Sequence, residues 1–419
     1  MADITRHIGL SLGADICWPA AFEELVAELD LRIPVGDDMV SFETERVTVE
    51  PYDLRYKPKY DLVLDRLTHW FNISREWIKK IVVMDDVYVL NNPWAIQSFE
   101  KHTSYAAMMR LGMLVPETWM MPAKEYDESF WDTAVTVRRY NKLFDMKSVG
   151  DQVGYPAFLK PYDGGGWVGV QKVRDLDELR AAYDTSGSRV HHLQKGVDDS
   201  DLFVRCIGVG PQIHIVRYDP DAPLHARYTV DFHFMDGDQW QRASRMTRVI
   251  NCFFGWDFNS CELMRQGDIL HPIDYANACP DSQVTSLHYH FPILVKALLR
   301  WSLFNAATKR RKPIDTQWAR FFAIADRDDL DFYAKLELYD EIAREYYATD
   351  EFEAFCEEHL GGLDAAAVEY FGTDRFKEVV RQKVSSLYPD HEVTQFTEHF
   401  FGLVQFWRQT EADRLGIKI

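Results

Sequence analysis

One segment constrains this chain more than any other part of its sequence. Phe158 and Leu159 predict the end of a strand, which delivers Lys160 as a fixed positive charge. Asp163 then opens a loop that carries three consecutive glycines at positions 164–166. Because glycine has no Cβ, such a loop can bring its backbone N–H groups close to a bulky anion. The segment therefore predicts a strand that ends at a polyanion-binding loop.

A second segment, about a hundred residues later, places acids where they complement that charge. Glu262 and Asp274 are twelve positions apart, with a turn expected at residues 266–268 between two antiparallel strands. Both carboxylates would then face the same cleft, and Asn277 follows shortly after. Carboxylate and amide oxygens are the hard ligands that Mg²⁺ prefers.

The composition limits the classes of protein to which the chain could belong. With 419 residues it is expected to form two or three packed units, and its 47% hydrophobic content indicates a large core. A formal net charge of −19 argues against a nucleic-acid or anionic-membrane partner. No apolar run approaches the ~20 residues of a membrane span, and the start of the sequence has no signal-peptide core. Six scattered cysteines without metal or disulfide spacing favour a cytoplasmic location.

The first 95 residues predict an open α/β domain. Strands are expected at residues 8–12, 60–66, 81–84 and 87–90, and a helix at residues 19–31. Short strands alternating with helices are typical of such a layered domain.

The middle of the chain predicts a different, antiparallel organisation. A helix is expected at residues 104–111, and strands at residues 190–194 and 202–209. Residues 217–229 and 235–240 are expected to complete the sheet, with aspartate-rich turns beside them.

From about residue 291 the apolar positions recur at helical spacing. Phe332, Leu336, Tyr339, Ile342 and Tyr346 form one stripe. A second stripe runs from residue 396 to residue 407. The remainder of the chain is therefore expected to be entirely helical, and the stripes must be buried against the rest of the chain or against a second copy.

These segments, in this order, resemble the ATP-grasp superfamily over roughly residues 8–281. Within it the chain is similar to carboxylate–amine ligases such as ribosomal-protein glutamate ligases, glutathione synthetase and D-alanine–D-alanine ligase. The resemblance implies a mixed α/β and α+β architecture: an ATP-grasp fold with an N-terminal open α/β domain and an all-helical C-terminal extension. The implied domains are residues 1–95 before the ATP-grasp part, 96–290 for the nucleotide-binding subdomains and 291–419 for the helical extension.

The resemblance also implies an ATP site. Lys101 would lie near the α-phosphate, Lys160 would bridge the α- and β-phosphates, and residues 163–169 would form a lid. Trp167, at the tip of this lid, would either close over the nucleotide or substrate or dock on the helical extension. The implied nucleotide-binding residues are Lys101, Lys160, Asp163, Gly164, Gly165, Gly166, Trp167, Gln194, Lys195, Val197 and Asp201.

Metal ligands and catalytic arginines follow from the same resemblance. Glu262, Asp274 and Asn277 would hold two Mg²⁺ ions, with Mn²⁺ as an alternative. The spacing before Asn277 is one residue longer than in the family, and a β-bulge at residues 275–276 could absorb it.

The arginines each have more than one interpretation. Arg265 matches a family arginine by its offset from Glu262. Arg205 is expected to bind a phosphate or a substrate carboxylate, or to be a paired structural arginine. Arg245, with Arg227 and Arg248, falls on the segment that faces the γ-phosphate in relatives. Most arginines of this kind are simply surface residues.

The resemblance implies an ATP-dependent ligase that joins a small-molecule carboxylate to an amine through an acyl phosphate. The alternatives are a kinase that phosphorylates a hydroxyl group and a non-catalytic nucleotide-binding scaffold. A homodimer is expected, and Asp15 is a candidate for contact with substrate from the N-terminal domain.

Overall fold

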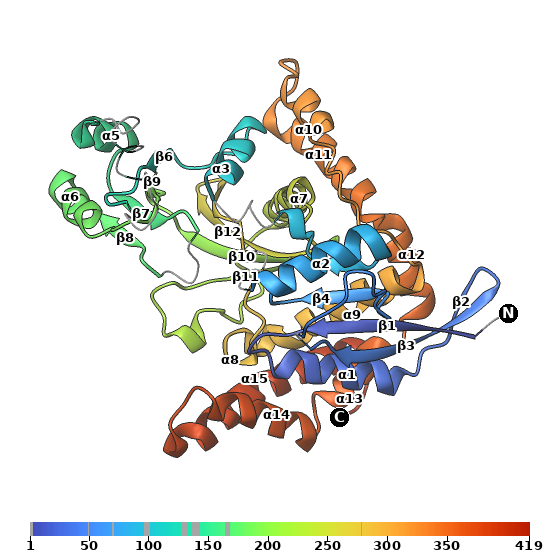
Figure 1. Ribbon diagram of the computed structural model, residues 1–419. Helices are drawn as coiled ribbons and strands as arrows, with labels where there is room; N and C mark the ends of the chain where they lie inside the picture. Colours follow the sequence, from blue (N-terminus) through green and yellow to red (C-terminus); the bar gives the residue numbers. More distant parts are fainter. Residues whose placement is uncertain are drawn as a thin grey trace.

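The computed structural model describes residues 3–48, 50–68, 71–95, 101–126, 133, 135, 137, 143–163, 168–277 and 279–419. Within these residues the strands form three sheets, with helices distributed around them (Figure 1). The expected α/β and α+β architecture is confirmed. No helix in the described part of the chain combines the length and the apolar character that a membrane span needs.

The N-terminal sheet has the order β2-β3-β1-β4-β5. Strands β1, β3, β4 and β5 run parallel, and β2 is antiparallel to β3. Their bounds are β1 Asp3–Ser11, β2 Ile33–Val35, β3 Asp38–Arg46, β4 Leu62–Asp65 and β5 Tyr88–Leu90. Helices α1 (Cys17–Leu29) and α2 (Asn72–Asp85) cover opposite faces of this sheet (Figure 1).

The expected strand at residues 81–84 is wrong, because these residues belong to α2. Ile78, Ile81 and Val82 recur at helical spacing and pack with Val63 and Val89 of the sheet. A short apolar run fits either structure, and its burial on one side of the sheet determines which one forms.

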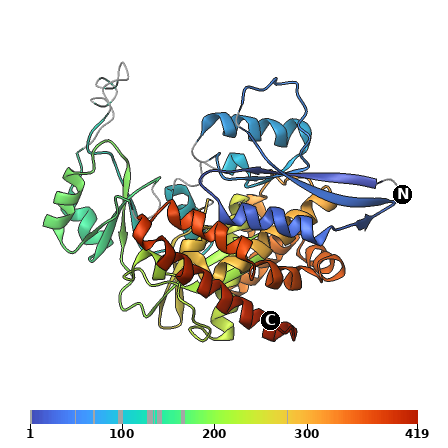
Figure 2. The ribbon, with the colours of Figure 1, turned by 90° about the horizontal axis from the view of Figure 1, so that it is seen from below.

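A small antiparallel sheet has the order β6-β9-β7-β8 and a hydrophobic core of its own. Its strands are β6 Thr118–Met121, β7 Ala157–Pro161, β8 Gln171–Val173 and β9 His191–Lys195. Helices α5 (Met146–Val153) and α6 (Leu176–Asp184) pack on it, and α3 (Lys101–Arg110) precedes it. Both views place this sheet at one end of the molecule, away from the N-terminal sheet (Figures 1 and 2).

The third sheet is antiparallel, with the order β11-β10-β12-β13. Its bounds are β10 Leu202–Val209, β11 Gln212–Arg217, β12 Phe258–Gln266 and β13 Ile269–Asp274. Helix α7 (Gly237–Phe254) packs against β10, β11 and β12.

Residues 217–229 extend the sheet only in part, and the expected strand at residues 235–240 is wrong. Arg217 ends β11, Tyr218 and Tyr228 form one antiparallel bridge, and the loop between them contains the short helix η2 (Leu224–Ala226). In the second, the side chain of Asp236 accepts a hydrogen bond from the backbone N–H of Gln239 and caps α7. The aspartates around Gly237 thus begin a helix rather than turn a hairpin.

From residue 284 onward the described elements are helical, as expected. They are α8 Val284–Leu287, η3 His288–His290, α9 Phe291–Ala307, α10 Trp318–Ala325, α11 Phe332–Tyr347, α12 Thr349–His359, α13 Leu363–Tyr370, α14 Asp374–Ser385 and α15 Asp390–Leu415. The predicted stripes are buried within the single chain: α11 packs on α7, and α15 packs on α9, α13 and α14. Their burial therefore does not require a second copy.

Helix α9 connects the N-terminal part, the third sheet and the helical extension. It contacts α1, β1 and β4 of the N-terminal part, β10 and β11 of the third sheet, and α12, α13 and α15. Helix α1 is in turn covered by α13 and α14, and the Cys17 thiol donates to the carbonyl of Val379.

A buried polar junction lies beside α9. Lys312, in the segment after this helix, forms an ion pair with Asp257, and both side chains are almost completely excluded from solvent. The Tyr88 hydroxyl of β5 donates to the other oxygen of Asp257 at 3.3 Å. One carboxylate thus ties the N-terminal sheet, the start of β12 and the helical extension together.

Candidate active site

Glu262 and Asp274 are cross-strand partners on β12 and β13. The neighbouring residue Leu263 pairs with Pro272, so Ile273 is the extra residue on β13. The irregularity therefore precedes Asp274, and the bulge expected at residues 275–276 is wrong. Its effect is to place both carboxylates on one face of the hairpin.

Each carboxylate is held by a cation from another element. Arg205 of β10 forms an ion pair with Glu262, and Lys101 at the start of α3 forms one with Asp274. Arg205 also donates to the Tyr228 hydroxyl at 2.8 Å and lies over the Tyr218 ring, which fixes the guanidinium. The structure thus brings Lys101, Arg205, Glu262 and Asp274 together.

The donor set fits Mg²⁺. Asp274 Oδ1 is buried without a hydrogen-bond partner among the described residues. Asn277 is anchored beside β12, since its backbone N–H donates to Asn259 at 2.9 Å and its amide nitrogen donates to the Ser260 carbonyl at 3.2 Å. Among the described residues no cluster of three or more His, Cys, Asp or Glu side chains forms a metal site. Mg²⁺ does not need one, because it is usually bound by one or two carboxylates, substrate phosphates and water.

A cavity of about 520 Å³ lies between the small sheet and the third sheet. Four of the predicted nucleotide-binding residues line it: Lys160, Gln194, Lys195 and Val197. Its remaining lining includes Phe158, Phe203, Met264 and Ile273, which the sequence had not indicated as binding residues, and also Arg227.

Two rows of side chains share one face of the third sheet. Phe203 pairs with Met264, and two positions along the same strands Arg205 pairs with Glu262. Because side chains two residues apart point to the same face, the apolar row and the charged row are adjacent. A ligand with a flat apolar end and an anionic end matches this order.

Lys160 lies on β7, at the border of the cavity. Its ammonium group donates to the amide oxygen of Gln194 at 2.7 Å, and the Gln194 amide nitrogen donates to the Thr118 hydroxyl at 3.0 Å. The pKa of Lys160 is lowered to about 8, chiefly by burial; Asp274 opposes this shift and nearby Lys101 adds to it. The Lys160 ammonium group is thus desolvated, and an anionic partner would stabilise its charged form.

Two backbone N–H groups at the end of β9 and just after it are already hydrogen-bonded within the protein. The N–H of Lys195 donates to the Glu117 carbonyl at 2.8 Å, and that of Gly196 donates to the Pro156 carbonyl at 2.9 Å. These two groups therefore hold the small sheet together and are not available to an adenine. The Lys195 side chain donates to the Tyr155 carbonyl at 2.7 Å.

The other predicted residues lie elsewhere. Arg265 forms a bidentate pair with Asp201 at 2.6 and 3.0 Å and donates to Gln239 of α7. Alternation along β12 points it to the face opposite Glu262. Arg245 pairs with Glu337 of α11 at 2.9 Å, at the contact between α7 and the helical extension.

The loop predicted to form the lid is only partly described. Asp163 pairs with Arg189 at 2.7 Å. Gly164, Gly165, Gly166 and Trp167 lie outside the described residues.

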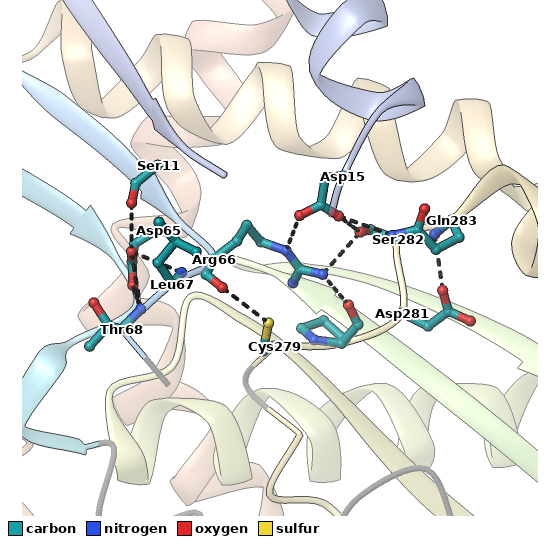
Figure 3. A network of polar contacts seen from close by, with 11 residues as sticks. Ser11, Asp15, Asp65, Arg66, Leu67, Thr68, Cys279, Asp281, Ser282 and Gln283 are labelled. Carbon is teal, nitrogen blue, oxygen red and sulfur yellow. Dashed lines mark hydrogen bonds and ion pairs between the residues drawn. The ribbon is translucent and has the colours of Figure 1, made fainter. Parts of the chain in front are cut away.

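Arg66, directly after β4, is a candidate functional residue that the sequence pattern did not indicate. It donates to Asp15, to the Pro280 carbonyl at 2.8 Å and to the Ser282 hydroxyl at 3.0 Å (Figure 3). It thereby joins the carboxyl edge of the N-terminal sheet to the loop that follows Asn277.

Asp15, the candidate for substrate contact, is part of the same network. Its oxygens accept from Arg66, Ser282 and Gln283 (Figure 3). Burial alone would raise the pKa of Asp15, but Arg66 and these hydrogen bonds outweigh it and lower the pKa. Asp15 therefore ties two parts of the chain together.

Comparison with solved structures finds an ATP-grasp protein and D-alanine ligases among the similar chains. The chain is similar to a RimK domain protein ATP-grasp from Sphaerobacter thermophilus, with 14% identity and a TM-score of 0.46, over 71% of this chain and 99% of that one. It is also similar to D-alanine–D-alanine ligase from Bacillus anthracis complexed with ATP, with 12% identity and a TM-score of 0.44, over 83% and 99% of the two chains. For the VanG D-Ala:D-Ser ligase from Enterococcus faecalis the values are 13%, 0.45, 81% and 100%. No family model matches the chain. At these values the likeness carries no weight for activity or substrate, which must be argued from the site itself.

Proposed function

We propose that this protein is an ATP-dependent ligase that joins a small-molecule carboxylate to an amine, releasing ADP and phosphate. The observation that carries the proposal is the adjacent pair of rows on the third sheet. Phe203 and Met264 border the cavity, and Arg205, Glu262 and Asp274 continue it with charges suited to a triphosphate and its metal. Lys160 approaches from the facing sheet.

In this proposal the chain positions and neutralises the reactants. Lys101 and Lys160 would bind phosphate oxygens, and Glu262, Asp274 and Asn277 would hold Mg²⁺. Mg²⁺, or Mn²⁺ in its place, would offset negative charge on the triphosphate. Arg205, fixed by two tyrosines, stabilises charge on the transferring phosphoryl group.

The reaction needs no side-chain nucleophile. A substrate carboxylate oxygen attacks the γ-phosphorus, the bond to the β–γ bridging oxygen breaks, and ADP leaves. The amine nitrogen then attacks the acyl carbon, phosphate leaves, and the nitrogen loses a proton. A cytoplasmic location and a homodimeric assembly remain predictions.

Hydroxylamine provides the test, because it traps any acyl phosphate as a hydroxamate. The full chain is incubated with MgATP, hydroxylamine and pools of amino acids and dicarboxylic acids. We expect hydroxamate and ADP in equal amounts from at least one pool. Asp274→Asn should abolish both products, and Asp268→Asn, in the exposed turn of the same hairpin, should retain them.

Two results would overturn the proposal in favour of an alternative. Release of ADP without hydroxamate, together with a phosphorylated hydroxyl compound, would identify a kinase. Saturable ATP binding without ADP release from any pool would identify a scaffold.

A further inference from the structure

A second cavity, of about 250 Å³, lies at the carboxyl edge of the N-terminal sheet. Its walls come from the ends of β1 and β3, from the loop that precedes β4 and from the first turns of α2. Ser11, the last residue of β1, and Glu45, one residue before the end of β3, line it, and Trp77 of α2 lies at one side. The volume suits a group about the size of an amino-acid side chain.

The place of this cavity in the fold favours a ligand. Strand β1 has β3 on one side and β4 on the other, so the chain order reverses across it. In open parallel sheets ligands bind outside the carboxyl ends of the strands at such a reversal. Ser11 lines the cavity, and its hydroxyl donates to Asp65 at 3.0 Å.

A series of polar contacts leads from the cavity to the loop that follows Asn277. Asp65 precedes Arg66, whose contacts lead to Pro280 and Ser282 in the loop after Asn277 (Figure 3). The cavity and the loop beyond the metal ligands thus meet the same edge of the sheet.

The chemistry of the walls favours a cation. Tyr60 and Trp77 pack edge to face at 6.1 Å, and Tyr52 and Tyr56 add further rings. Lys59 already lies 5.9 Å from the centre of the Tyr60 ring, which shows that this wall accommodates an ammonium group. Glu45 pairs with Lys59, whereas no cation in the described part of the chain pairs with Glu50.

A buried, unpaired polar group supports this interpretation. Ser74, in the first turn of α2, lines the cavity and is only 4% exposed. Its hydroxyl has no hydrogen-bond partner among the described residues. An orphaned buried hydroxyl costs free energy unless a ligand or water satisfies it.

We propose that this cavity binds a positively charged group with an apolar body, belonging to one of the two substrates of the ligation. The inference rests on the proposed function. The cation held here is not the reacting amine, which must be uncharged to attack. It is a second charged group that selects the substrate through Glu50 and the aromatic walls.

The test uses three probes that share a phenyl ring on a short chain and differ mainly in charge: phenethylamine is a cation, 2-phenylethanol is neutral and phenylacetate is an anion. Each is titrated into the full chain without ATP, and binding is followed by NMR. We expect saturable binding of phenethylamine, with shifts confined to residues of the cavity, and at least fivefold weaker binding of the other two. Glu50→Gln should weaken phenethylamine binding about fivefold, because it removes the unpaired charge.

Glu43→Gln is the matched control, since Glu43 is an exposed glutamate of β3 that does not line the cavity. Its binding should equal that of the unchanged chain. A second variant, Tyr52→Leu, should also weaken binding. Equal binding of all three probes, absence of saturation or an unaffected Glu50→Gln variant would overturn the proposal.

These results are separable from those for the proposed function. Probe binding without hydroxamate formation in any pool would retain the cation site and remove the ligase. Hydroxamate formation without probe binding would retain the ligase and remove the cation site. If both hold, Glu50→Gln should raise the KM for the substrate and leave the KM for MgATP unchanged.

Discussion

Glu262 of β12 lies directly across the hairpin from Asp274 of β13, and each carboxylate is paired with a cation from outside the hairpin. Arg205 comes from the adjacent strand, whereas Lys101 comes from a helix that precedes the small sheet. We expect the two ion pairs to separate when nucleotide and metal bind. The carboxylates would then bind the metal, and Arg205 and Lys101 would bind phosphate. The site is therefore assembled before the nucleotide arrives.

Lys160→Ala should weaken ATP binding about ten- to hundredfold, because a charge-assisted contact contributes about 1.5–3 kcal/mol. Calorimetric titration with a non-hydrolysable MgATP analogue measures it. Lys124→Ala is the control, since Lys124 is an exposed lysine paired with Asp184 outside the cavity. Equal affinities for the two variants would remove Lys160 from the site.

Glu262→Ala should retain nucleotide binding and lose ADP release, because the adenosine end of the site is unchanged and the metal loses a ligand. The substitution also leaves the buried Arg205 without its carboxylate, so the melting temperature should fall. ADP release near that of the unchanged protein, at saturating Mg²⁺, would show that Glu262 has no part in turnover.

Affinity for ATP should depend on pH through Lys160. Its pKa is lowered to about 8 in the free protein, chiefly by burial, and bound phosphate would stabilise the charged form. The contribution of Lys160 to binding is therefore complete well below pH 8, and it declines as the pH rises from about 8 towards the higher pKa of the bound state. Lys160→Arg should remove this dependence, because arginine stays charged. A titration between pH 6.5 and about 9.5 compares the two proteins.

The junction of Asp257 and Lys312 should make a strongly coupled contribution to stability. Asp257→Asn should destabilise the chain by about 3–5 kcal/mol, since it leaves a buried ammonium unpaired. The double variant with Lys312→Met should recover much of the loss, because neither charge remains. Denaturant unfolding of the four proteins measures the coupling. Additive losses would show that the two residues act independently.

A chain ending near residue 309 should fail to fold, because it keeps α9 but removes α12, α13 and α15 from its faces. Circular dichroism and solubility assess this. The mass of the full chain in solution tests the predicted homodimer separately. A folded truncated chain would show that the helical extension is dispensable.

Local patterns were sufficient for much of the fold. Strands β10, β12 and β13 and the helices beyond residue 290 follow from runs and periodicities of side chains within one element. The pairing of Glu262 with Asp274 followed from a turn and a spacing. The four-residue run at 81–84 and the aspartates around Gly237 were ambiguous, because each fits two structures and only packing or capping decides between them.

Contacts between distant segments could not be predicted in this way. The register of β10 against β12 brings Asp201 to Arg265, and nothing near either residue indicates the other. Phe203 and Met264 are ordinary strand residues until the same register makes them one wall of the cavity. Arg66 gains its place only when the N-terminal sheet meets the loop after Asn277.

Helices α13 and α14 cover α1, and this has a consequence for how the chain folds while it is being translated. Cys17 meets Val379, 362 positions later, so the first helix emerges from the ribosome long before its partners exist. The apolar face of α1 cannot be buried by these partners until most of the chain has been translated, and closing so long a loop slows folding. We expect the N-terminal domain to be completed only after the last helices are released, and newly made chains to bind chaperones until then.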